Sequence, residues 1–373
     1  CSIVSPGCAN CYAMRLAGTR LREHPSRAGL TKCVNGKTVW TGEVRFNEQW
    51  LTQPLRWRKP RKIFVCAHGD LFHPNVPDEW IDRVFAVMAL APQHTFMVLT
   101  KRAEHMRQYF NTYGRFARVL EARDGLPNFD HALPENWPLP NVMLGVTAED
   151  QTRAAERIPH LLATPVAKRF VSIEPMLSPV DLRRWLATAN VTCKKCNTSF
   201  WLHEANPCKH AGGGGWTLAC PNCGDCKCTP SQDDRGDPVT WSPPASWKPK
   251  EIGRFDRVHP TIDVKSWLDL VICGGESGLA ARPIHPDWAR SLRDQCKDAG
   301  VPFFFKQWGE WMPIVRGIVT ECYGSAVASV AWPDGTITHG NALEHGGNGF
   351  LLDRVGKARA GRCLDGEEHN GEA

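Results

Sequence analysis

The sequence contains no long hydrophobic run: no apolar stretch reaches the ~18 residues that a membrane-spanning helix needs. It also shows no secretion signal at its start. These absences predict a cytoplasmic protein with no membrane partner. No initiator methionine precedes Cys1, so we expect a fragment or a processed piece that lacks a first strand of its fold.

The overall composition is that of an ordinary globular protein. Of 373 residues, 42% are hydrophobic and 23% are charged, which predicts one large domain with an insertion or two modest domains. The net charge of +6 is compatible with a nucleic-acid or phosphate-bearing partner but does not require one. Tryptophan is abundant, and several tryptophans lie in polar loops, where they either stack on bases or pack the loops: Trp241, Trp247, Trp308 and Trp311.

Short apolar runs recur along the chain. Each is rich in β-branched or aromatic residues and does not alternate with polar ones, which is typical of strands buried on both faces. Amphipathic helical patterns separate them, at 78–90, 101–113, 151–162 and 285–299. The six runs are 62–67, 95–100, 141–147, 169–173, 268–273 and 301–306.

Strands that alternate with helices predict an α/β fold in which parallel strands form a partial or full (β/α) barrel. A doubly wound parallel sheet is the alternative. The alternation of strands and helices is interrupted by a cysteine-rich stretch, which we interpret as an inserted module. We expect the N-terminal part of the barrel at 1–191, the inserted module and a Pro/Trp linker at 192–264, the last barrel strands at 265–312, and a small β-rich tail with a disordered end at 313–373.

Acids and bases follow each apolar run, where parallel α/β folds gather their chemistry. Ordinary solvated loop ends are the alternative for any one of them, but the whole set favours a ligand site at one rim. Gly274 and Gly275 lie between a run and Glu276, and would allow a ligand to approach the backbone closely. The candidate catalytic residues are Lys101, Glu174, Glu276 and Lys306.

Three cysteines open the chain with the spacing Cys1-x6-Cys8-x2-Cys11. Three thiolates can hold three irons of a [4Fe–4S] cluster and leave the fourth iron open to a cofactor. Zinc is an alternative, although it usually takes four ligands and only His24 and Cys33 could supply the fourth. Ordinary thiols are the other alternative.

This triplet, which ends in Cys-x-x-Cys-Tyr and precedes a parallel barrel, resembles the radical S-adenosylmethionine superfamily, in particular the branch that contains spore photoproduct lyase. The blocks DLFH, LTKR, SIEP, GGESG and PFFFKQWGEW together resemble an uncharacterised bacteriophage and prophage family often described as radical-SAM-like. The resemblance covers most of 1–185 and 265–366.

The resemblance implies reductive cleavage of S-adenosylmethionine to a 5′-deoxyadenosyl radical in a bacterial host. It implies cluster ligation by the three cysteines and a cofactor site at His68, Gly69 and Asp70, with Asp70 on the cofactor's amino group. Two departures are visible. The usual spacing is x3 then x2, and Asn10 stands where an aromatic residue usually precedes the last cysteine.

A second cysteine cluster lies in the inserted module. Two Cys-x-x-Cys pairs predict a zinc ribbon, in which each pair gives two thiolates to one tetrahedral zinc. A second iron–sulfur cluster is an alternative, and further thiols (Cys208, Cys226 and Cys228) could form a second site. The ribbon is either a structural lid or a contact for nucleic acid or a protein partner. The predicted zinc ligands are Cys193, Cys196, Cys220 and Cys223.

Two functions therefore follow from the sequence. The first is a radical-SAM-like iron–sulfur enzyme, a lyase or a base-modifying enzyme, acting on a nucleobase, nucleotide or nucleic acid in a phage context. The second is a non-catalytic, metal-stabilised phage protein that binds nucleic acid. A zinc hydrolase that uses the rim acids is a weaker third, because the sequence has no histidine-rich ligand set.

Overall fold

A computed structural model describes the following residues: 1–124, 126, 137–186, 190–192, 199–201, 206–209, 216–219, 268–314, 328–339 and 349–372. The chain divides into two compact units, each assembled from separate segments. The first contains Cys1–Val180, Ile272–Ala289 and Phe304–Asn370, and the second contains Asp181–Val271, Arg290–Phe303 and Gly371–Ala373.

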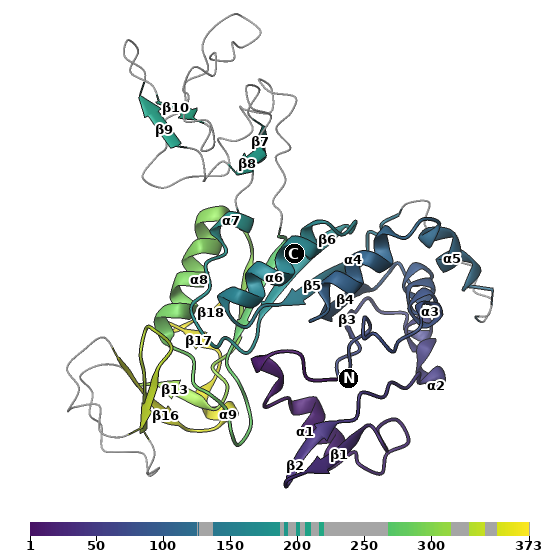
Figure 1. Ribbon diagram of the computed structural model, residues 1–373, viewed down its shortest axis with the longest axis horizontal. Coiled ribbons are helices and arrows are strands. Elements are labelled where there is room, and N and C mark those ends of the chain that lie inside the picture. Colours follow the sequence, from purple (N-terminus) through teal and green to yellow (C-terminus); the bar gives the residue numbers. More distant parts are fainter. Residues whose placement is uncertain are drawn as a thin grey trace, which may run out of the picture. The chain divides into compact units, whose positions relative to one another are not determined.

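A six-stranded parallel sheet, curled into a half-barrel, forms the centre of the fold (Figure 1). Its spatial order is β3-β4-β5-β6-β11-β12, so the strands of this sheet lie side by side in the order in which they occur along the chain. All six predicted strands are confirmed, because buried parallel strands are continuous apolar runs. Their bounds are Lys62–Val65 (β3), Thr95–Thr100 (β4), Val142–Thr147 (β5), Lys168–Ile173 (β6), Leu270–Gly274 (β11) and Phe303–Gln307 (β12).

Amphipathic helices connect these strands, as the apolar periodicity predicts. An acidic first turn begins the helix that follows β3, and the Asp150 side chain caps the helix after β5 by accepting the Arg153 N–H at 2.7 Å. A short helix that the sequence did not predict, α5 (Arg115–Glu121), precedes β5. In the structure, the four predicted helices extend over Asp78–Ala89 (α3), Ala103–Asn111 (α4), Gln151–Leu162 (α6) and Pro286–Ala299 (α8).

The N-terminal segment contains small elements that the sequence did not predict. The cysteine loop passes through a 3-10 turn, η1 (Pro6–Cys8), into helix α1 (Tyr12–Gly18). A hairpin of β1 (Thr31–Val34) and β2 (Lys37–Trp40) follows. The segment then ends in α2 (Glu48–Leu51) and η2 (Gln53–Arg56), just before β3.

The described part of the C-terminal tail contains several short strands. An antiparallel sheet has the order β13-β16-β14-β15, and Trp308 and Trp311 pack into the interior and donate their indole N–H groups to backbone oxygens. The chain continues beyond this sheet, over the segment for which a disordered end was expected. Buried Leu364 anchors a closing hairpin, and the Phe305 N–H donates to the His369 carbonyl oxygen. The elements are Trp311–Pro313 (β13), Ala328–Ala331 (β14), Ile337–His339 (β15), Phe350–Arg354 (β16), Lys357–Ala360 (α9), Cys363–Leu364 (β17) and Glu367–Glu368 (β18).

The predicted inserted module falls in the second unit. Its described residues belong to two antiparallel strand pairs, β7 with β8 and β9 with β10, and a short helix, α7, precedes the module. All four cysteines of the predicted zinc ribbon lie outside the described residues, so the ribbon stays a prediction. No helix in the described part of the chain is long and apolar enough to cross a bilayer. The elements are Arg183–Leu186 (α7), Asn190–Thr192 (β7), Ser199–Trp201 (β8), Asn206–Lys209 (β9) and Trp216–Ala219 (β10).

Candidate functional site at the carboxyl edge of the sheet

The carboxyl edge of the half-barrel gathers the polar residues that the sequence singled out. Parallel strands end at the same edge of a sheet, so residues that follow successive strands become neighbours. The predicted candidates lie within or directly after β3, β4, β6, β11 and β12: His68, Gly69, Asp70, Lys101, Glu174, Gly274, Gly275, Glu276 and Lys306. The N-terminal cysteine loop lies on this edge and is anchored to it at three points.

The first anchor is Glu149, which follows β5 and is completely buried. Its Oε1 accepts the Gly7 N–H at 3.1 Å and a hydrogen bond from Lys101 Nζ at 3.3 Å, and its Oε2 accepts one from Arg157 at 3.0 Å. Lys101 Nζ also donates to Ser5 Oγ at 3.3 Å. A β-carbon on Gly7 would lie 2.7 Å from Lys101 Nζ and 2.9 Å from Glu149 Oε1, so a larger residue would have to displace this pair.

The charge balance around Glu149 keeps it ionised. Burial by itself would raise the pKa of this carboxyl, because a low dielectric disfavours the charged form. Lys101, the Ser5 hydroxyl and Arg157 outweigh that burial and leave the pKa below its ordinary value. The anchor is therefore a carboxylate held between two cations in the interior.

The second anchor is Glu276, which follows β11. Its Oε2 accepts hydrogen bonds from Asn10 Nδ2 at 2.9 Å and from the Arg282 N–H at 2.8 Å, and its Oε1 accepts one from the Arg282 guanidinium at 2.6 Å. The same guanidinium donates to the Pro6 carbonyl oxygen at 3.0 Å. These donors hold the pKa of Glu276 below its ordinary value against the opposing effect of burial. Asn10, which stands where the resemblance expects an aromatic ring, fastens the loop.

The third anchor joins Asp70, after β3, to Arg102, after β4. Asp70 Oδ2 accepts hydrogen bonds from Arg102 at 2.7 Å and from the Lys101 N–H at 3.2 Å, and its Oδ1 accepts them from Thr100 Oγ1 at 2.7 Å and the Phe72 N–H at 3.0 Å. Arg102 then donates to Ser2 Oγ at 2.7 Å. Both carboxylate oxygens of Asp70 are thus engaged, so a cofactor's amino group would have to displace one of these donors.

Four further side chains of the edge are less constrained. Lys306 Nζ lies 3.3 Å from Glu174, and Tyr12 donates to the Ala67 carbonyl oxygen at 2.7 Å and packs edge-on against the His68 ring. Burial raises the pKa of the Tyr12 hydroxyl, with Lys306 opposing this effect and Glu174 adding to it. Tyr12 is thus protonated at neutral pH and shares this part of the edge with an ammonium and a carboxylate.

Lys101 and Lys306 form a matched pair for testing which ion pairs support the fold. Each lies 3.3 Å from a carboxylate, but their side chains are 17% and 52% exposed, and those of their partners 0% and 18%. We expect Lys101→Met to destabilise the fold by about 3–5 kcal/mol, because it leaves a buried charge without this partner. Lys306→Met should change the free energy of unfolding by less than ~1 kcal/mol. Urea unfolding measures both, and equal losses would contradict the difference in burial.

The two predicted glycines contact the chain itself. A β-carbon on Gly274 would lie 2.6 Å from Glu174 Oε1, and one on Gly275 would lie 1.9 Å from the Trp308 carbonyl oxygen. The close backbone approach that the sequence predicted is therefore an approach of β11 to Glu174 and to the end of β12.

The three cysteines of the loop are free thiols, and each is only partly buried. Within the described residues, no three His, Cys, Asp or Glu side chains lie close enough together to hold a single metal ion. An iron–sulfur cubane makes a different demand, because each thiolate binds a different iron and the ligands are spaced more widely. A donor set of three unpaired thiols on one anchored loop fits such a cluster.

Several residues of this edge were missed as site residues. Glu149 and Arg102 come shortly after strands, so the sequence placed them at the carboxyl edge, but they were not selected as candidate site residues. Arg157 lies eight positions beyond Glu149, in the middle of the following helix α6, and its long side chain reaches back to the carboxylate at 3.0 Å. Nothing in the sequence pattern marked Asn10 as a site residue, because its hydrogen-bond partner Glu276 is 266 positions away.

The chain belongs to the family described as Protein of unknown function (DUF5131), which it matches over residues 1–372. The comparisons with curated proteins and with solved structures give no match. Family membership thus adds no activity, and the function has to be argued from the carboxyl edge itself.

Proposed function

We propose that Cys1, Cys8 and Cys11 ligate a [4Fe–4S] cluster on the carboxyl edge of the half-barrel. We further propose that the protein uses the cluster to cleave S-adenosylmethionine and acts on a nucleobase, nucleotide or nucleic acid. One observation carries the proposal. Each cysteine lies next to an anchored residue, because the residues held by the edge include Ser2, Gly7 and Asn10.

This alternation of anchor and cysteine suits a preorganised ligand set. The anchors hold the backbone of the loop, while the three thiols stay free of disulfide bonds and are partly exposed. A loop that served only to cover the sheet would need neither three thiols nor buried charged anchors, which are expensive to desolvate. Ligands held by neighbouring contacts keep their geometry before the metal arrives.

When bound, such a cluster supplies a single electron to a sulfonium cofactor through its one iron that lacks a protein ligand. The chain's own residues would bind and orient the reactants. Lys306 offers an ammonium to a carboxylate, and Glu174 offers a carboxylate to an amine. Tyr12 and His68 add a hydroxyl and an imidazole beside them. Lys101 and Glu276 act mainly by holding the cysteine loop, as their contacts with Ser5 and Asn10 indicate.

Anaerobic reconstitution with iron and sulfide tests the proposal. We expect about four irons per chain and a broad absorbance near ~400 nm. Cys8→Ala should lose both signals, whereas Cys33→Ala, which removes an exposed thiol outside the loop, should keep them. Zinc alone, with no iron after reconstitution, would overturn the cluster and favour the metal-stabilised binding protein.

The catalytic half of the proposal needs its own measurement. Reconstituted, reduced protein should form 5′-deoxyadenosine from S-adenosylmethionine, and the Cys8→Ala variant should not. A full complement of iron without 5′-deoxyadenosine would sink the enzyme hypothesis and leave the cluster with a structural role.

A further inference from the structure

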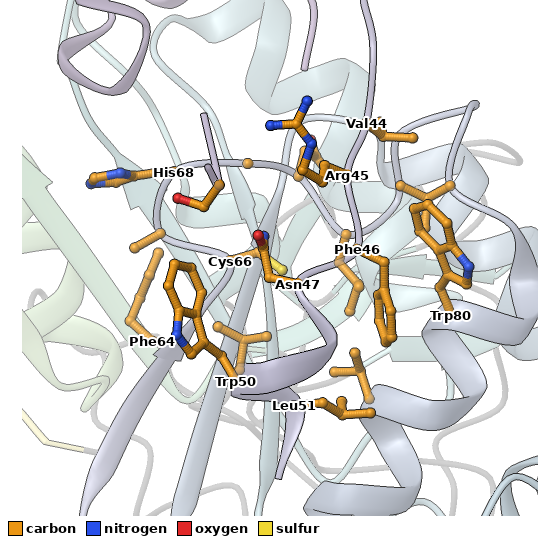
Figure 2. Close-up of a pocket in the computed structure, with 18 of the residues that line it drawn as sticks. Val44, Arg45, Phe46, Asn47, Trp50, Leu51, Phe64, Cys66, His68 and Trp80 are labelled. Atoms are coloured by element: carbon orange, nitrogen blue, oxygen red, sulfur yellow. The ribbon is translucent and has the colours of Figure 1, made fainter. Parts of the chain in front are cut away.

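A pocket of about 540 Å³ lies beside the outermost strand, β3, next to the segment that leads through α2 and η2 (Figure 2). Its lining includes Cys1, His68 and Asp70. The pocket therefore adjoins the carboxyl edge and the first of the three cysteines. A ligand bound there would lie next to the proposed reaction centre.

Aromatic side chains form much of the wall, and they fall into two kinds. In Figure 2, Phe46 and Trp80 lie together on one side, with ring centroids 5.1 Å apart, and the Arg83 guanidinium covers the Phe46 ring. Trp50 and Phe64 lie on the other side and are 38% and 45% exposed. The first pair is packed structure, whereas the second pair presents ring surface that a flat ligand can cover.

Two arginines give the pocket positive charge. Arg27 donates to the Ser26 carbonyl oxygen at 2.9 Å and lies 3.3 Å from His68 Nδ1, and its buried Nε has no hydrogen-bond partner. Arg45 donates to two backbone carbonyl oxygens, at 2.6 and 2.7 Å. Among the described residues, neither guanidinium pairs with a carboxylate.

The remaining charges of the lining do not cancel these arginines. Asp70 is already neutralised by Arg102, outside the pocket, at 2.7 Å. Glu43 is exposed at the surface, as is Arg45, and it makes no ion pair with either arginine among the described residues. His68 is neutral, since a guanidinium can only donate and Nδ1 must accept from it, and burial and the Arg27 charge lower the His68 pKa. The pocket thus combines free aromatic surface with cations that lack a counter-ion, and an aromatic anion fits both.

We propose that this pocket binds a nucleotide, whose base stacks on Trp50 and Phe64 and whose phosphate contacts Arg27 and Arg45. Stacking tolerates any base, because every base has a π-face. As the substrate site of the proposed enzyme, this inference rests on the proposed function. Nucleotide binding itself does not, because it needs no iron: among the pocket residues, Cys1 is a proposed ligand of the cluster and Asp70 helps to anchor the loop.

Calorimetric titration of the full, iron-free chain tests the proposal with AMP, CMP, adenosine and inorganic phosphate. Both nucleotides should bind more tightly than adenosine and than phosphate. Trp50→Ala and Phe64→Ala should each weaken nucleotide binding about fivefold or more, the lower end for a base stacked on an aromatic ring. Tyr113→Ala, which removes a fully exposed ring outside the pocket, should change nothing.

Arg27→Met separates the phosphate contact from stacking. It should remove the preference for AMP over adenosine and leave adenosine binding intact. Absence of binding by either nucleotide, or unchanged binding in both ring variants, would overturn the site. Displacement of AMP by S-adenosylmethionine in a one-to-one ratio would overturn the substrate assignment and make this the cofactor site. Since these titrations use iron-free protein, their failure is distinguishable from failure to bind iron.

Discussion

Glu149→Ala should both destabilise the fold and abolish iron binding. The substitution leaves Lys101 and Arg157 without the buried carboxylate that they share, which should cost about 3–5 kcal/mol of unfolding free energy. It also removes the acceptor of the Gly7 N–H, so the loop loses the anchor next to Cys8. Urea unfolding and iron content after reconstitution measure the two effects.

A second substitution keeps the two effects separable. Glu149→Gln retains the shape and an oxygen that can accept the Gly7 N–H, but it cannot neutralise two cations. We expect it to destabilise the fold while retaining part of the iron. Glu104→Gln, on an exposed carboxylate of α4, is the control and should behave like the unaltered protein. If Glu149→Ala keeps its full iron content, the loop does not depend on this anchor.

The stability of the protein should also depend on pH through Glu149. Its folded pKa is lowered, so its contribution is fully present above the unfolded pKa of about 4.3. That contribution is lost as pH falls below this value and through the folded pKa. The Glu149→Gln variant should therefore lose less stability than the unaltered protein between neutral pH and acid. Parallel losses in both proteins would assign the acid sensitivity to other carboxylates, such as Glu276.

The inner strands of the half-barrel were predictable because they are largely buried on both faces, whereas the edge strand β3 is partly exposed and was found by its apolar composition. A continuous apolar run such as that of β5, which is buried throughout, has no other good interpretation between two amphipathic helices. The hairpin of β1 and β2 gave no such signal, since β1 is largely exposed and its pattern carries little hydrophobic information. Its turn uses Asn35 and Gly36, both with positive φ, and this Asn-Gly pair was the local sign of a hairpin.

The candidate site was predictable in its place but not in its pairing. Residues directly after parallel strands must meet at one edge, so Lys101, Glu174 and Glu276 could be selected from the sequence. The sequence could not show which of these residues would form hydrogen bonds or ion pairs with other parts of the protein. The hydrogen bond from Asn10 to Glu276 joins residues 266 positions apart, and sequence spacing does not report such a contact. The structure thus divides the predicted set into anchors of the loop and the more exposed ion pair of Glu174 and Lys306.

Gly275→Ala should be among the most damaging substitutions that add a single carbon. The added β-carbon would lie 1.9 Å from the Trp308 carbonyl oxygen, a backbone atom that cannot rotate away. Nor can Gly275 retreat freely, because its N–H donates to the Gln307 carbonyl oxygen at 2.8 Å. Overpacking of this kind costs about 1–3 kcal/mol and occasionally more, and a clash between two backbones belongs at the upper end.

The damage should extend to the cysteine loop, because Gly275 directly precedes Glu276. The turn at Gly309 interlocks with this residue: a β-carbon on Gly309 would lie 2.0 Å from the Glu276 carbonyl oxygen. Displacing β11 from the end of β12 thus moves the carboxylate that holds Asn10, beside Cys11. Gly69→Ala is the matched control, since nothing lies within 4 Å of its added carbon. The melting temperature and the iron content should both fall in Gly275→Ala and stay unchanged in Gly69→Ala. Lost stability with full iron content would show that the loop keeps its place without Glu276.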